Sequence, residues 1–137
     1  MFILISSSCT KSNSPILPVS IVGKWKWVST YHDYPLSATN PSTPGNSGIE
    51  EYVIFNTNAT WKKIQNNVTV DSGTCATGHG FYQPLPTATK YVYDSVKYYN
   101  SLQGATWDYY SISKDTLTFS GGFAGLYGSD SKTFVKQ

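Results

Sequence analysis

The side chains best able to do chemistry in this sequence are two histidines, two cysteines and a small number of carboxylates. His32 is followed by Asp33, and His79 comes shortly after Cys75. Neither spacing matches a known metal-ligand motif, and histidines in loops are usually solvated, so the sequence predicts no metal site. Apart from His79, nothing close to Cys75 in the sequence would lower its pKa, so a catalytic thiol is not expected.

The acidic residues do not form a catalytic pair through their spacing. Glu50 and Glu51 are adjacent, so in a strand their side chains point to opposite faces of the sheet. No Gly-x-Ser-x-Gly motif marks a hydrolase nucleophile. Catalysis would require polar groups, such as His32 with Asp108 or Glu51, to converge in the interior. The sequence therefore predicts a protein that is not an enzyme and has no cofactor.

Composition favours an all-β fold and argues against nucleic acid as a partner. A chain of 137 residues suits one domain with one core. Aromatic residues make up 15% and charged residues only 13%, and the abundant Tyr, Trp, Thr and Val favour strands. The net charge is only +2, and the ten basic residues are all Lys, so bidentate recognition of phosphate or guanine has no donor.

The stretch Ile21–Tyr31 is the first that can bury large side chains. Its alternation of residue types predicts a half-buried strand. Gly23 near its start permits a close approach of the backbone. One face of this strand carries, by the same alternation, Trp25, Trp27, Ser29 and Tyr31.

Similar short runs, joined by turn residues, predict about eight strands in all. Loops are expected over 32–48, 76–89 and 121–130, turns over 66–67 and 71–73, and a tight hairpin over 113–115. The pattern predicts a single all-β domain, either an up-and-down barrel or a sandwich. The predicted strand segments are Val22–Tyr31, Glu50–Asn56, Thr60–Asn66, Val68–Val70, Thr74–Cys75, Lys90–Tyr99, Thr106–Ile112, Thr116–Phe119 and Lys132–Lys136.

The first residues are typical of an exported protein. The apolar Phe2–Ile5 runs into Ser6–Ser8, as at the end of a secretory signal. Cys9 comes directly afterwards and resembles the lipobox cysteine of bacterial lipoproteins, which is acylated. The resemblance implies a lipid anchor at Cys9, with Thr10–Ser20 as a flexible tether to the membrane.

The expected role of Cys75 depends on whether Cys9 is acylated. If Cys9 is acylated, Cys75 has no partner and is expected to be a small buried hydrophobe in a strand. If Cys9 is unmodified, a Cys9–Cys75 disulfide becomes possible in an oxidising compartment.

Several segments match, in order, the motifs of a known family. They are Gly23-Lys24-Trp25, Val53–Phe55 with Asn58–Trp61, Asp71–Cys75, Tyr109–Phe119 and Thr133–Lys136. With these motifs the chain from Ile21 onward resembles lipocalin-like lipoproteins of Bacteroidetes-type bacteria. The resemblance implies an antiparallel up-and-down barrel over 21–137, closed near Trp25, with Tyr34–Gly48 beside an open mouth. Lipocalins stack an arginine over the motif tryptophan, and here either Lys132 or Lys136 supplies a weaker cation–π contact or the contact is absent.

The resemblance also implies a small-molecule site inside the barrel. An aromatic cup would suit an apolar or planar ligand. The alternative is a filled barrel, because eight strands enclose a space only just wide enough for side chains. Tyr34–Gly48 and Gly121–Asp130 would then contact a protein partner, as in an inhibitor or an envelope component. Either protein would lie in the cell envelope. The candidate ligand-binding residues are Trp27, Tyr31, Phe55, Trp61, Tyr109 and Phe119, with Gly23 and Trp25 as structural residues.

Overall fold

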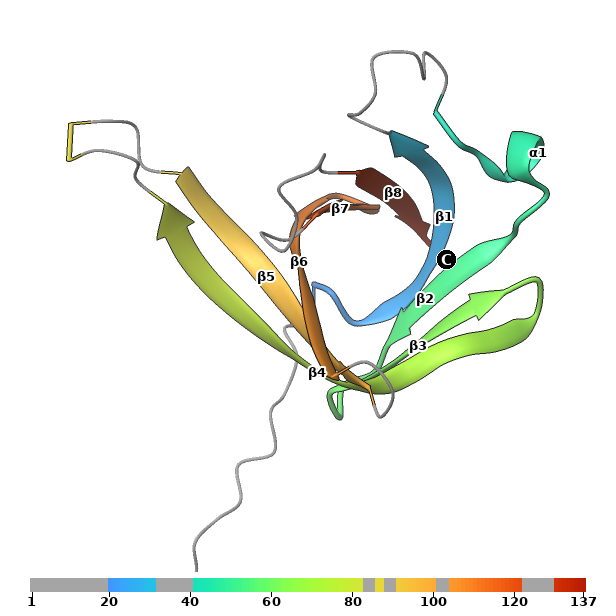
Figure 1. Cartoon of the computed structure of the whole chain (residues 1–137), viewed down its shortest axis with the longest axis horizontal. Coiled ribbons are helices and arrows are strands. Elements are labelled where there is room, and N and C mark those ends of the chain that lie inside the picture. Colours follow the sequence, from blue (N-terminus) through green and yellow to red (C-terminus); the bar gives the residue numbers. More distant parts are fainter. Residues whose placement is uncertain (1–19, 32–40, 83–85, 88–90, 101–103, 122–129) are drawn as a thin grey trace, which may run out of the picture.

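The chain forms a closed antiparallel barrel in which each strand pairs with the next and the last pairs with the first (Figure 1). The computed structural model describes residues 20–31, 41–82, 86–87, 91–100, 104–121 and 130–137. The predicted all-β up-and-down barrel is therefore confirmed. Its elements are β1 (Gly23–Tyr31), α1 (Pro44–Ser47), β2 (Glu51–Phe55), β3 (Thr60–Gln65), β4 (Val68–Tyr82), β5 (Tyr91–Asn100), β6 (Gly104–Ser113), β7 (Thr116–Gly121) and β8 (Ser131–Lys136).

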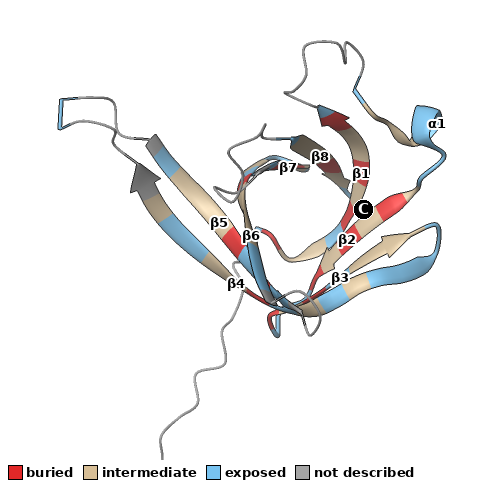
Figure 2. Ribbon diagram, in the orientation of Figure 1, coloured by how far each residue is buried: buried red, intermediate tan, exposed pale blue. Residues whose placement is uncertain are grey.

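The two ends of the barrel differ in how they are filled. We call the end at which the even-numbered strands begin the open end, and the other the closed end. Large apolar side chains fill the closed end, and buried positions recur along the ring of strands (Figure 2). The buried side chains with the least exposure are Trp25, Phe55, Ile21, Leu117, Val96 and Cys75.

Gly23 and Trp25 organise the closed end, as the sequence predicted. The Trp25 side chain is fully buried, and its Nε1 donates a hydrogen bond of 2.8 Å to the Ile21 carbonyl. Lys136 Nζ lies 5.3 Å from the centre of the Trp25 ring, so Lys136 supplies the predicted cation–π contact. Gly23 has φ +139°, and a Cβ there would lie 3.2 Å from Lys136 Cε. A glycine is needed because the backbone is left-handed and the lysine stem crosses it.

A β-bulge in β1 changes which side chains face inward. Trp27 pairs with Phe134 and Ser29 with Thr133, so Val28 is an extra residue on β1. Beyond the bulge the phase is reversed: Thr30 is 4% exposed and Tyr31 is 59% exposed. The prediction that Tyr31 shares the inner face with Trp27 is therefore wrong.

β4 is one continuous strand of 15 residues, where the sequence predicted two short strands, a turn and a loop. Residues 74–82 pair in unbroken register with β5, so Gly78 and Gly80 belong to the sheet. A Cβ on Gly80 would lie 2.9 Å from the ring of Tyr93, its partner on β5. This glycine therefore makes room for an aromatic ring that packs across the neighbouring strand, and does not mark a loop.

The β4–β5 hairpin extends beyond the ring of strands (Figure 1). The pairing of β5 with β6 begins only at Asp94, and the pairing of β4 with β3 ends at Thr74. In this extension His79 Nδ1 lies 2.7 Å from Asp94 Oδ1, and both side chains are exposed.

The turns follow the sequence more closely than the long strand does. Asn66 and Asn67 both have positive φ in the β3–β4 turn, and Lys114 has φ 53° in the predicted hairpin between β6 and β7. Ala59, between β2 and β3, adopts φ 59°. Ala59 and Lys114 therefore adopt a positive φ, which is uncommon for residues other than glycine and asparagine.

The part of the predicted first loop that the structure describes is partly ordered by local bonds. Thr43 caps α1 through a reciprocal pair of hydrogen bonds with Asn46, and Gly48 ends the helix with φ 68°. Ser42 forms a bridge with Thr30, the last inward-facing residue of β1. Thr30 pairs with Lys132 at the open end, so Ser42–Gly48 lies at that end, as the resemblance implied.

Candidate functional site

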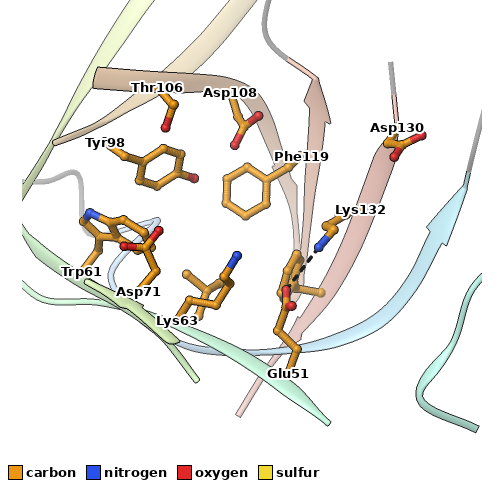
Figure 3. A pocket seen from close by; sticks show the side chains of 12 residues that line it. Glu51, Trp61, Lys63, Asp71, Tyr98, Thr106, Asp108, Phe119, Asp130 and Lys132 are labelled. Atoms are coloured by element: carbon orange, nitrogen blue, oxygen red, sulfur yellow. Dashed lines mark hydrogen bonds and ion pairs between the residues drawn. The ribbon is translucent and has the colours of Figure 1, made fainter. Parts of the chain in front are cut away.

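A cavity of about 350 Å³ occupies the open end of the barrel. This volume falls at the small end of the range for small-molecule pockets. The described residues that line it come from every strand except β1, and Figure 3 shows their side chains around a common space. They are Glu51, Val53, Trp61, Lys63, Asp71, Tyr98, Thr106, Asp108, Phe119, Asp130, Lys132 and Phe134.

A connected row of aromatic rings forms the floor of the cavity. Trp61 contacts Tyr98 with ring centres 4.7 Å apart, and Tyr98 stacks on Phe55 at 6.3 Å. Phe55 continues to Phe119 at 6.3 Å, and Phe119 to Phe134 at 5.6 Å. The rings come from five strands, so closure of the barrel brings them together. Such contacts stabilise the row beyond the burial of its area.

Trp61 carries a polar atom that its surroundings leave unsatisfied. Its Nε1 is buried and has no hydrogen-bond partner among the residues that the structure describes. A buried donor without an acceptor costs about 1–3 kcal/mol. The contact of the indole with the Tyr98 ring, about 0.5–1.5 kcal/mol for an aromatic pair, offsets part of this cost.

Glu51 is a buried carboxylate in the wall of the cavity. Its residue exposure is 3%, and its Oε2 accepts a hydrogen bond of 2.6 Å from Gln65 Nε2. Its Oε1 lies 3.4 Å from Lys132 Nζ, and this ion pair is drawn in Figure 3. A buried carboxylate needs such partners, because desolvation would otherwise disfavour its charge.

Glu50 lies on the opposite face of the sheet from Glu51, as the alternation predicted. Its Oε1 accepts hydrogen bonds from Lys26 Nζ at 2.9 Å and from the Tyr52 hydroxyl at 2.7 Å. Hydrogen bonds from Lys26 and Tyr52, with the charge of Lys26, lower the pKa of Glu50. The two adjacent glutamates therefore serve separate contacts and form no carboxylate pair.

Tyr98 and Asp108 form a polar contact above the aromatic floor. Burial, the charge of Asp108 and a hydrogen bond with that carboxylate raise the pKa of the Tyr98 hydroxyl well above its ordinary value. The phenol therefore stays neutral and donates to the carboxylate. A carboxylate is thus held beside the rings of Tyr98 and Phe119, as Figure 3 shows.

Three of the predicted ligand-binding residues lie at the cavity. Trp61 and Phe119 line it, and Phe55 lies in the floor between the rings of Tyr98 and Phe119. Trp27 is buried, but its Nε1 donates to Thr30 Oγ1 at 3.0 Å and it is not part of the cavity lining. The inward orientation predicted for these four side chains is confirmed.

Tyr31 and Tyr109 do not face the cavity, which corrects the sequence prediction. Tyr31 is exposed because of the bulge in β1. Tyr109 packs at ring-centre distances of 4.4 Å from Tyr93 and 4.9 Å from Trp107, on the outer surface. Side chains alternate along β6, and its inner face is the one with Thr106, Asp108 and Tyr110.

The charged part of the lining is the feature that sequence reasoning missed. The signal was present in the period of the strands, because Glu51 is in phase with Val53 and Phe55 on β2. In the same way Lys63 is in phase with Trp61, and Lys132 with Phe134. A charged residue in phase with a buried aromatic predicts a polar group inside the barrel.

The groups considered for metal binding and thiol chemistry lie apart. His79 pairs with Asp94 on the extended hairpin, and His32 and Asp33 lie outside the described residues. Within the described ranges no group of three or more His, Cys, Asp or Glu residues could hold a metal ion. Cys75 is free and buried in β4, and burial raises its pKa to about 11, so the predicted small buried hydrophobe is confirmed.

Comparisons with protein-family models, with curated proteins and with solved structures find no match to this chain. The lipocalin resemblance therefore stays a prediction that depends on the motifs in the sequence. Among the helices in the part of the chain that the structure describes, none is long and apolar enough to cross a membrane. Cys9 and the tether after it lie outside the described residues.

Proposed function

We propose that this protein binds a small molecule in the cavity at the open end of its barrel, as a lipocalin-like domain tethered to the cell envelope through acylated Cys9. The observation that carries the proposal is the cavity of about 350 Å³ above a floor of contacting aromatic rings. A chain that used its barrel only as a scaffold would have no need of such a space, because eight strands can be filled by side chains.

The lining refines the kind of ligand that the proposal requires. The sequence predicted an apolar or aromatic ligand. The floor of Trp61, Tyr98 and Phe119 favours a ligand that has a planar, apolar portion. Charged residues such as Asp108 and Lys132 surround the same space, so the ligand also has a polar group. Pockets of this kind fix an apolar body by a few placed polar contacts.

The competing proposal is a protein-interaction, inhibitor or structural envelope lipoprotein. The filled closed end, with Trp25, Phe55 and Leu117 buried, favours it, since that part of the interior leaves no space for a ligand. Under this proposal the open end would contact a protein through residues such as Ser42–Gly48.

Blocking the cavity separates the two proposals. Thr106 lines the cavity and Ala105, its exposed neighbour on β6, points to the outer surface. In Thr106→Phe the ring fills part of the cavity, whereas in Ala105→Phe the same ring lies outside. Both variants place a residue with high strand propensity in β6.

The measurement is calorimetric titration of the full chain with a panel of small aromatic compounds. We expect saturable binding that Thr106→Phe weakens at least tenfold and that Ala105→Phe and Tyr31→Ala leave unchanged. Equal binding by both Phe variants would place the ligand elsewhere. Binding of no compound by the folded wild-type chain would favour the protein-interaction proposal.

A further inference from the structure

We infer that the cavity takes an organic cation, an ammonium group carried on a ring or a short apolar chain. The inference rests on the proposed function, because it names the ligand chemistry of the same cavity. It comes from the juxtaposition of an aromatic floor and a lining whose charge is opposite to that of the chain.

The charge of the lining is the first step. The described lining residues include four carboxylates, of Glu51, Asp71, Asp108 and Asp130, and two ammonium groups, of Lys63 and Lys132. The whole chain has a net charge of +2, so the excess of negative charge is local to the cavity. A cleft whose walls carry an excess of one sign concentrates the opposite charge, and the excess of two carboxylates over ammonium groups favours cations here.

The two lysines are placed against carboxylates of the same lining. Lys132 Nζ lies 3.4 Å from Glu51 Oε1, and the Glu51 side chain is almost completely buried. Lys63 on β3 is directly opposite Asp71 on β4. An anionic ligand would have to compete with these carboxylates for the lysines, and the chain has no arginine to offer in their place.

The aromatic floor supplies the second half of a cation site. Trp61, Tyr98 and Phe119 border the cavity together with Asp108. A cation within about 6 Å of a ring centre is attracted to the ring face, and more strongly where water is excluded. An ammonium group in this cavity therefore contacts a carboxylate and a ring face together, while its apolar part packs on the remaining rings.

Asp108 is the carboxylate that we assign to the ammonium group. Its hydrogen bond with the Tyr98 hydroxyl holds it next to the ring row. That bond comes from a neutral phenol, so it orients the carboxylate and adds no positive charge. A carboxylate fixed beforehand loses little entropy when the ligand binds.

The test compares three compounds that share one ring system and differ in charge. They are naphthylethylamine, naphthylethanol and naphthylacetate, titrated calorimetrically into the full chain at neutral pH and physiological salt. We expect the amine to bind about tenfold or more tighter than the alcohol, which corresponds to about 1.4 kcal/mol, and the carboxylate to bind weakest.

A matched pair of variants tests the assignment of Asp108. Asp108→Asn keeps the shape and an oxygen that accepts from Tyr98, but removes the charge. Asp115→Asn makes the same change in the exposed β6–β7 turn at the closed end. We expect Asp108→Asn to lower the affinity for the amine about tenfold and to leave the alcohol unchanged. Asp115→Asn should change neither.

Each other outcome overturns a definite part of the reasoning. Alcohol or carboxylate binding as tightly as the amine would overturn the cation inference and leave small-molecule binding in place. An equal loss for all three compounds in Asp108→Asn would show that Asp108 only supports the fold of the cavity. If no compound binds the folded chain, both the inference and the proposed function are contradicted.

Discussion

Gly23→Ala tests the most constrained position of the closed end. Gly23 has φ +139°, and an added Cβ would lie 3.2 Å from Lys136 Cε, a contact that is tighter than usual. A non-glycine residue in such a sparsely populated backbone region costs about 1–3 kcal/mol. Displacement of the Lys136 stem would also weaken its contact with the Trp25 ring, a cation–π contact of about 0.5–1 kcal/mol at a partly exposed site.

One effect opposes this loss. Replacing glycine by alanine reduces the freedom of the unfolded chain and by itself stabilises by about 0.4–1 kcal/mol. The strain and the weakened contact exceed that gain, so we expect Gly23→Ala to lower the free energy of unfolding by about 1–3 kcal/mol. Unfolding in urea, followed by tryptophan fluorescence, measures the change.

Two control variants make the result specific. Gly45 in α1 lies outside the left-handed region, and a Cβ there would meet only Thr43 Oγ1, at 3.8 Å. Gly45→Ala should therefore be neutral or slightly stabilising. Lys136→Met removes the cation and keeps the glycine, which separates the ring contact from the backbone strain. Equal stability of Gly23→Ala and Gly45→Ala would refute the strain argument.

Three further predictions concern the thiols and one turn. Burial raises the Cys75 pKa from 9.0 to about 11, so the stability that the protonated thiol contributes is complete below pH 9 and is lost as the pH rises toward 11. We therefore expect a thiol reagent at pH 8 to label Cys75 in urea and not in the native protein, and rapid native labelling would contradict its burial. Lys114 has φ 53° in the β6–β7 turn, so Lys114→Asn should raise the free energy of unfolding by a few tenths to about 1 kcal/mol, measured in urea, and an unchanged stability would contradict strain at this position. In a bacterium that processes lipoproteins, the wild-type chain should fractionate with membranes and gain the mass of acyl chains, and Cys9→Ser should do neither; an unmodified wild-type Cys9 would remove the anchor from the proposal.

The match between sequence and structure is closest where a feature depends on neighbouring residues. Turn residues predicted the β3–β4 turn at Asn66–Asn67 and the hairpin at Lys114, because a positive φ is a local requirement. Gly23 and Trp25 were assigned structural roles from their places at the head of the first strand. Phe55, Trp61 and Phe119, which the resemblance implied as ligand-binding residues, are buried inside the barrel.

The match fails where the pairing of strands changes a local pattern. The turn-like glycines of β4 lie in a strand because Tyr93 on β5 fills the space that a side chain would take at Gly80. The alternation of β1 breaks at Val28 because β8 has one residue fewer across from it. The residues of β4 and β1 alone do not show which side chains, or how many residues, the paired strand places opposite them.

The sequence alone determined an all-β chain of about eight strands, because residue type sets strand propensity and a period of two sets which side chains share a face. Only the tertiary structure decided which of the two faces is inside, since both faces of β6 carry aromatic residues, Tyr109 on one and Tyr110 on the other. Closure of the barrel fixes the register of all strands together. That register gathers the charged groups and the aromatic floor around one cavity.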